Sequence, residues 1–267
     1  MRQTQTPPTH AGHRTEPITQ SRIYVGLALG MTVTVFWGFA YTYFTPVFAG
    51  AYPQVSPAVH VHGWSFFLWF LLLPLQAFLM ATGRRRAHIA LGGASVALAA
   101  VMVFTGVLVA SVRIHEGLSA TEPDEFTTFW KGFGQLIMYN MILFVGFYGT
   151  AIARRDEPGL HKRMIVLAGA SVLPAAIFRI IVGLNGFHWL ATPGWVMPAA
   201  FFLPAVVIVI GMAHDRVAKG FVHRAYPVGL AVLLLVHALG IVLAGTAAGE
   251  AVSRVMALFA RVFGDLY

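Results

Sequence analysis

The chain has 267 residues, of which 58% are hydrophobic and only 10% are charged, and it contains no cysteine. Soluble domains carry roughly 25% charged residues, so this composition excludes an ordinary water-soluble protein and indicates an integral membrane protein. The lack of cysteine excludes disulfides, thiolate metal sites and cysteine nucleophiles. Any bound metal must therefore be held by histidine or by oxygen ligands.

Seven apolar stretches are long enough to cross a hydrocarbon layer of about 30 Å, which takes roughly 20 helical residues. They cover residues 23–44, 60–81, 88–111, 129–153, 164–184, 195–213 and 227–248. We therefore expect an all-α polytopic membrane protein with seven transmembrane helices. Residues 1–22 are expected to form a flexible cytoplasmic tail, residues 23–248 the transmembrane domain, and residues 249–267 a short amphipathic helix on the outer surface. The alternative for the last segment is continuation of the seventh helix into solvent.

Prolines within the spans predict local kinks, which neighbouring helices in a membrane bundle accommodate. They are Pro74, Pro174, Pro198 and Pro204.

The basic residues predict the orientation of the chain. Most of them fall in the tail and in alternate loops: Arg2, Arg14, Arg22, Arg84, Arg85, Arg86, Arg154, Arg155, Lys162, Arg163, Arg216, Lys219 and Arg224. The positive-inside rule makes this side cytoplasmic, with the N-terminus inside and the C-terminus outside a bacterial inner membrane. The net charge of +8 is then explained by topology and by contact with anionic membrane lipid, so we expect no nucleic-acid partner.

The segments around residues 81–96 and 151–172 are similar, because each runs from a basic loop through a histidine to a Gly-Ala-Ser-Val sequence. This weak repeat predicts two related hairpins that form a four-helix core from the second to fifth spans. The remaining spans would surround that core.

Histidine is the residue type most able to carry chemistry here, since we expect every carboxylate, including Asp215, to lie outside the spans. The histidines near the spans separate into two layers. The outer layer contains His60, His62, His115 and His188, the cytoplasmic layer His88, His161, His214 and His223, and His237 lies at mid-depth. A neutral imidazole is a good ligand for haem iron, copper or zinc.

His88 and His161 occupy equivalent places in the two hairpins, so one haem b could bridge them at the inner face. On the outer side, His60 or His62 could pair with His115 or His188. His60 and His62 are about 200° apart on a helix, so they cannot easily share one metal. The alternative is that these histidines bond lipid headgroups or neighbouring helices; for His237 it is a structural hydrogen bond to a backbone carbonyl.

Arg179 is the one permanent charge expected well inside a span. Its guanidinium either reaches outward to the interface or holds an anion, such as a haem propionate, a quinone oxygen or a substrate carboxylate. Gln135 and Asn140 are polar at similar depth and either bond a ligand or a neighbouring helix.

Three segments carry a resemblance: residues 60–64 (HVHGW), residues 86–92 (RAHIALG), and residues 160–164 (LHKRM) followed by Arg179. In these segments the chain resembles an uncharacterised group of bacterial multi-pass membrane proteins, which brings no established activity. More distantly, it is similar to transmembrane haem b cytochromes of the four-helix, ascorbate-reducible kind. That similarity implies haem ligands paired across the bundle, here His88 and His161.

Our leading hypothesis is a membrane redox protein. It would bind haem b or another His-ligated metal, with copper or zinc as the other choices, and exchange electrons with a quinone or another lipid-soluble substrate. The alternative is a non-catalytic protein, either a transporter of a small amphipathic solute or an assembly partner of another membrane protein. Whether the chain is an enzyme stays open.

Overall fold

The computed structural model describes residues 18–186 and 193–267, with side chains described from Arg22 onward. All regular structure in these ranges is helical, which confirms the expected all-α fold. The α-helices are α1 (Ile18–Phe39), α2 (Thr45–Phe48), α3 (Pro57–Ala81), α4 (Arg85–Ser119), α5 (Glu125–Ala153), α6 (Pro158–Ser171), α7 (Pro174–Leu184), α8 (Val196–Phe202), α9 (Ala205–Lys219), α10 (Ala225–Leu243) and α11 (Ala247–Phe263). A π-helix, η1 (Ala40–Phe44), joins α1 to α2, and a 3-10 helix, η2 (Gly264–Leu266), follows α11.

Six helical segments in the described residues are long and apolar enough to cross a membrane, and α6 with α7 makes a seventh if this bent pair counts as one span. The chain is therefore a polytopic membrane protein, as its composition predicts. The bend of 41° between α6 and α7 lies at Pro174, one of the expected kinks. Proline has no N–H for the helical hydrogen bond, so α6 ends before it and α7 begins at it. Pro204 separates α8 from α9 in the same way, whereas Pro74 lies inside an unbroken α3.

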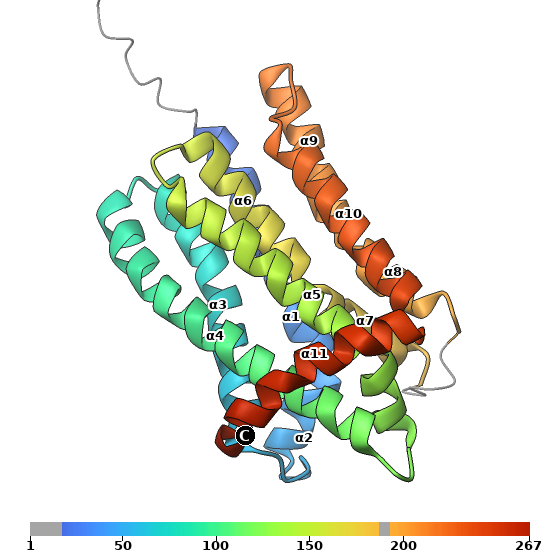
Figure 1. Cartoon of the computed structure of the whole chain (residues 1–267). Coiled ribbons are helices and arrows are strands. Elements are labelled where there is room, and N and C mark those ends of the chain that lie inside the picture. Colours follow the sequence, from blue (N-terminus) through green and yellow to red (C-terminus); the bar gives the residue numbers. More distant parts are fainter. Residues whose placement is uncertain (1–17, 187–192) are drawn as a thin grey trace, which may run out of the picture.

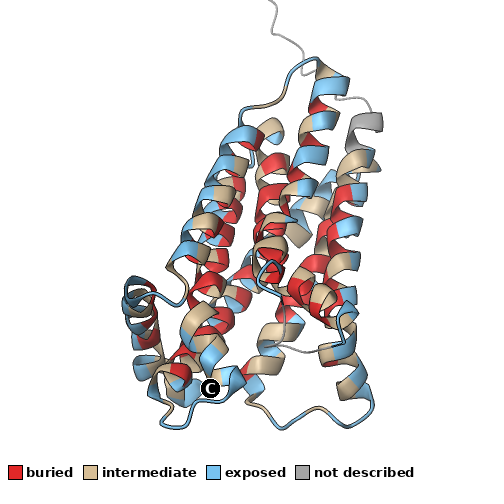
Figure 2. Ribbon diagram, turned by 90° about the vertical axis from the view of Figure 1, so that its right-hand side faces the viewer, coloured by how far each residue is buried: buried red, intermediate tan, exposed pale blue. Residues whose placement is uncertain are grey.

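The spans pack in chain order at the centre of the bundle. α3 contacts α4, α4 contacts α5, and α5 contacts α6, while α1 packs against α3, α6 and α7 and joins this core as a fifth member. Large apolar side chains fill the middle: the Trp69 and Phe144 rings lie 4.9 Å apart, and both side chains are 1% exposed. Figure 2 shows the buried positions along the inside of the bundle and the exposed ones around its outside. Since the outside includes exposed residues such as Leu68 and Val209, this apolar surface suits a lipid environment.

The two ends of the bundle differ in character. The loops after α3, α5 and α9 gather at the upper end in Figure 1, and we call it the arginine-rich end because Arg84 and Arg154 lie in the first two loops. α11 lies across the lower part of the bundle and packs on α4 and α5, so we call the lower end the α11 end.

α11 is a separate helix and does not continue α10 into solvent. The chain turns at Gly245, whose φ is +74°, and the Thr246 side chain caps α11 by accepting the Gly249 N–H at 3.1 Å. The Phe104 and Phe259 rings, 5.9 Å apart, join it to α4. At its far end, the Ser56 hydroxyl at the start of α3 donates to the Tyr267 carbonyl.

Candidate functional site

Two histidines from different hairpins meet at the arginine-rich end. His88 lies in the first turn of α4 and His161 in the first turn of α6. Their ring centroids are 6.3 Å apart and their planes are at 89°, and both residues are partly buried. The structure thus brings together the two imidazoles that the repeat places in equivalent positions.

A backbone carbonyl orients the His161 ring. The His161 Nδ1 atom lies 2.8 Å from the carbonyl oxygen of Ala151, in the last turn of α5. A carbonyl can only accept, so Nδ1 carries the ring hydrogen and donates. Nε2 of the neutral ring therefore keeps a free lone pair, which is the arrangement that metal-ligating and proton-accepting histidines use.

Gln76 of α3 orients the His88 ring in the opposite sense. Its amide nitrogen donates to the His88 carbonyl (3.2 Å) and to His88 Nδ1 (2.9 Å), while its oxygen accepts the Gly92 N–H (2.9 Å). The backbone groups of α4 fix this orientation of the amide, because the carbonyl only accepts and the N–H only donates. His88 Nδ1 is then an acceptor and its Nε2 carries the hydrogen. No other group among the described residues bonds the two Nε2 atoms, so within them the pair offers one free donor, on His88, and one free acceptor, on His161.

A buried ion pair lies two residues along α6 from His161, and it was not predicted from the sequence. Arg163 of α6 donates through Nε to Asp215 Oδ2 (2.7 Å) and through Nη2 to Asp215 Oδ1, and through Nη1 it donates to the Gly159 carbonyl. The His223 N–H donates to Asp215 Oδ2 at 3.2 Å. Both charged side chains are 0% exposed.

Our expectation that Arg163 and Asp215 lie in the loops or beyond the spans was wrong. The two side chains neutralise each other, so α6 and α9 can continue with the charges inside the bundle. The sequence held one signal: Asp215 follows the buried residues Ile208 and Gly211 by seven and four positions, which places it on the buried face of its helix.

The outer histidines do not form a common site within the described residues. His60 Nδ1 is hydrogen-bonded to the Tyr43 hydroxyl at 2.9 Å, whereas His62 donates through Nδ1 to the Met102 carbonyl of α4 at 3.2 Å. The two therefore face different neighbours, as their helical spacing predicts. His115 is partly buried, and no hydrogen bond or ring contact joins it to a described residue. His188 lies outside the described residues, among which no group of three or more His, Asp or Glu could hold a metal ion.

His237 has protein partners at both ring nitrogens. Nδ1 donates to the Phe201 carbonyl at 2.8 Å, so Nε2 of the neutral ring is an acceptor, and the side-chain amide of Asn140 lies 3.0 Å from it and can donate to it through its NH₂ group. The ring is 0% exposed. This geometry fits the structural hydrogen bond that the sequence left as an alternative, and Asn140 joins α5 to α10 through it. Gln135, at a similar depth, is buried, and neither atom of its amide has a hydrogen-bond partner among the residues that the structure describes.

Arg179 lies on α7, far from the histidine pair. It follows His161 by 18 residues, which corresponds to about 25 Å of helix, so it cannot assist a ligand held there. Its Nη1 donates to the Ala175 carbonyl at 2.9 Å, and its guanidinium lies 4.3 Å from the centroid of the Phe39 ring.

In comparisons with protein families, curated proteins and solved structures, no match to this chain was found.

Proposed function

We propose that this chain is a membrane redox protein that holds a lipid-soluble quinone or quinol between His88 and His161. The observation that supports the proposal is the complementary state of the two rings, which lie 6.3 Å apart. One ring has a free N–H and the other a free lone pair, so they match a ligand group that both accepts and donates a hydrogen bond.

A quinol hydroxyl is such a group. Its oxygen accepts from His88 Nε2–H, and its hydrogen is donated to His161 Nε2. When the quinol gives one electron to an external one-electron acceptor, His161 takes up the proton of this hydroxyl as a general base. A second acceptor molecule takes the second electron, and the proton of the other hydroxyl leaves to solvent. The Ala151 carbonyl, which accepts from His161 Nδ1 at 2.8 Å, stabilises the imidazolium that forms. Gln76 keeps His88 as the donor.

A haem b or a single copper or zinc ion held by the same pair is the second candidate. The Nε2 atoms of the two rings, whose centroids are 6.3 Å apart, would be its ligands, and haem iron or copper would supply one-electron redox chemistry there. His161 Nε2 is ready to ligate. His88 would have to lose its Nε2 hydrogen and turn the Gln76 amide, which makes the metal the weaker candidate.

We further propose that the arginine-rich end faces the cytoplasm of a bacterium and that the protein lies in the inner membrane. The positive-inside rule supports this orientation, which would place the N-terminus inside and the C-terminus outside. Anionic lipids would contact the arginine-rich end, and membrane lipid, quinone and another membrane protein are the partners this arrangement would meet.

Quinone binding by the purified protein tests the proposal. We expect binding of decylubiquinone to weaken about 10-fold or more in His88→Ala and in His161→Ala. Each variant removes one of the two hydrogen bonds to the ligand and leaves that polar group of the ligand without a partner. His115→Ala is the matched control, because no hydrogen bond or ring contact joins that partly buried ring to a described residue. Unchanged binding in both His88→Ala and His161→Ala would refute the site.

Metal analysis and an absorption spectrum of the same preparation test the second candidate. A Soret band with stoichiometric iron, or stoichiometric copper or zinc, that disappears in His161→Ala would replace the quinone by the metal. Release of the metal by a chelator should then leave the helix content unchanged. The helices are held together by an apolar core, and His88 and His161 are not part of that core.

A further inference from the structure

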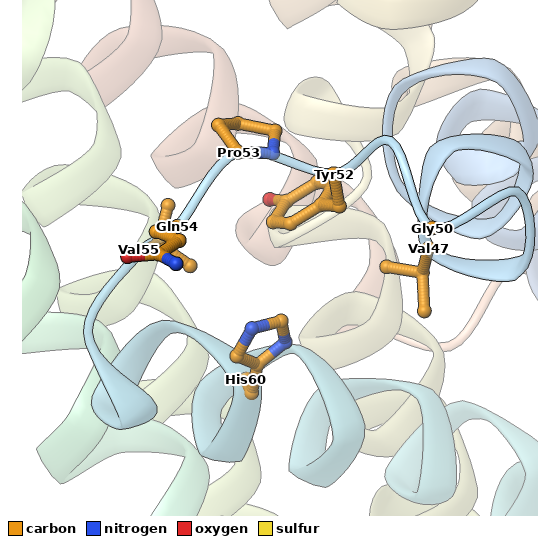
Figure 3. A pocket seen from close by; sticks show the side chains of 7 residues that line it. All are labelled: Val47, Gly50, Tyr52, Pro53, Gln54, Val55 and His60. Atoms are coloured by element: carbon orange, nitrogen blue, oxygen red, sulfur yellow. The ribbon is translucent and has the colours of Figure 1, made fainter.

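A polar hollow lies at the α11 end, distant from the histidine pair. It has a volume of about 400 Å³ and is lined by Val47, Gly50, Tyr52, Pro53, Gln54, Val55 and His60. We call it the Tyr52 pocket. Figure 3 shows the Tyr52 and His60 rings on opposite sides of the hollow, with Val47 and Gln54 at its flanks. A pocket of this size, with aromatic walls and a few polar atoms, has the composition of a small-ligand site.

The π-helix η1 builds one wall of the pocket. Its Tyr43 is 5% exposed and forms the 2.9 Å hydrogen bond to His60 Nδ1. The Tyr43 and Tyr52 rings are 5.1 Å apart, and the Tyr52 and His60 rings 5.6 Å apart. Single π-helical turns are rare and occur frequently at functional sites. Here the π-turn places a phenol where it holds the imidazole at the edge of the hollow.

The surroundings of Tyr52 carry one uncompensated positive charge. The Arg179 guanidinium lies 4.3 Å from the centroid of the Phe39 ring, about one helical turn before Tyr43, whose ring is 5.1 Å from that of Tyr52. Burial raises the pKa of the Tyr52 phenol, and the Arg179 and Arg113 charges act against that rise. Arg113 is neutralised by Glu116 at 2.8 Å. In the part of the chain that the structure describes, Arg179 has no carboxylate partner, and its buried Nε atom has no hydrogen-bond acceptor.

An unpaired guanidinium inside a membrane span is costly and is usually kept for a function. The Phe39 ring and the Ala175 carbonyl offset part of the cost, but neither carries a negative charge. An anion near Tyr52 would offset the rest. One positive charge matches a ligand with one negative charge better than a ligand with two. The aromatic walls of the pocket suit a ligand whose remaining part is apolar.

We propose that the Tyr52 pocket binds a small organic monocarboxylate, with Arg179 supplying the charge and Tyr52 and His60 the hydrogen bonds to the carboxylate. The site is independent of the proposed quinone site, because Arg179 and His161 are about 25 Å of helix apart. It would serve either as a transport site or as a regulatory site of the membrane protein.

The probe for this proposal is 4-fluorobenzoate, whose binding to the full chain in lipid nanodiscs is followed by broadening of its 19F signal. We expect saturable binding that weakens about 10- to 100-fold in Arg179→Gln, since the positive charge that balances the carboxylate is lost. Arg179→Lys should retain an intermediate affinity because it keeps the charge but loses the planar donors. Tyr52→Phe should weaken binding about 2- to 10-fold.

Three controls make the outcome decisive. The neutral analogue 4-fluorobenzamide should bind much more weakly than the carboxylate. Arg155→Gln, which removes an exposed positive charge at the arginine-rich end, and His161→Ala should leave binding unchanged. Absence of saturable binding, equal binding of the amide, or wild-type affinity in both Arg179→Gln and Tyr52→Phe would overturn the proposal. If Arg179→Gln does not fold, Arg179→Lys and Tyr52→Phe decide in its place.

Discussion

The buried pair of Arg163 and Asp215 gives the sharpest prediction about stability. Asp215→Ala leaves the Arg163 guanidinium at 0% exposure, and the Gly159 carbonyl is then its only acceptor among the described residues. Removing one partner of a buried ion pair costs about 3–5 kcal/mol, because an uncompensated charge stays behind. We expect Asp215→Ala to lower the free energy of unfolding by that amount.

Replacing both partners should be far less damaging. In Arg163→Met/Asp215→Leu no charge is left inside the bundle, and apolar pairs of similar volume are often neutral relative to a buried ion pair. The double variant should therefore be more stable than Asp215→Ala alone, although it contains one more substitution. The single variants Arg163→Met and Asp215→Leu and the double variant together form a cycle whose coupling energy we expect to exceed about 2 kcal/mol.

Unfolding by SDS in mixed micelles, followed by tryptophan fluorescence, measures these energies. Asp156→Ala provides the control, because Asp156 is an exposed carboxylate in the neighbouring loop. The reasoning fails if Asp215→Ala stays within about 1 kcal/mol of wild type, or if the effects of the two single variants simply add.

Three further outcomes can be checked by the same unfolding measurement. Gly38→Ala should destabilise the protein by about 1–3 kcal/mol, because its Cβ would stand 2.4 Å from the Ala176 carbonyl oxygen, whereas Gly30→Ala, with open space around it, should not. Asn140→Ala should cost about 1–3 kcal/mol, since it leaves the buried His237 Nε2 without a partner. Hydrogen bonds from the Thr127 hydroxyl and backbone N–H hold the pKa of Asp124 below its ordinary 3.8. The stabilisation from this helix cap is therefore complete above pH 3.8 and lost as the pH falls through the lowered value, and Asp124→Ala should remove that acid-dependent step.

Hydropathy and proline positions predict most of this fold, because crossing a bilayer requires about 20 apolar residues in a helix. The helical class, the bend at Pro174 and the separate C-terminal helix all follow from such local rules. The pairing of His88 with His161 was predicted from the repeat, since equivalent positions in two hairpins lie at the same depth.

The contacts that orient those histidines could not be predicted. Gln76 is 12 residues away from His88 in sequence, and its amide matters only because α3 and α4 pack at one particular rotation. The ion pair between Arg163 and Asp215 could not be predicted for a related reason. A charge near the end of an apolar stretch fits equally well in a loop or in a buried pair, and only the packing of α6 against α9 decides between them.

The hydrogen bond between Ser56 and Tyr267 has a practical consequence. It fixes Tyr267 next to the residues Gln54 and Val55 that line the Tyr52 pocket. An affinity tag or reporter fused after Tyr267 would therefore emerge at the mouth of that hollow and crowd its entrance. Purification handles for ligand studies belong instead ahead of α1, because that helix begins at the opposite, arginine-rich end of the bundle (Figure 1).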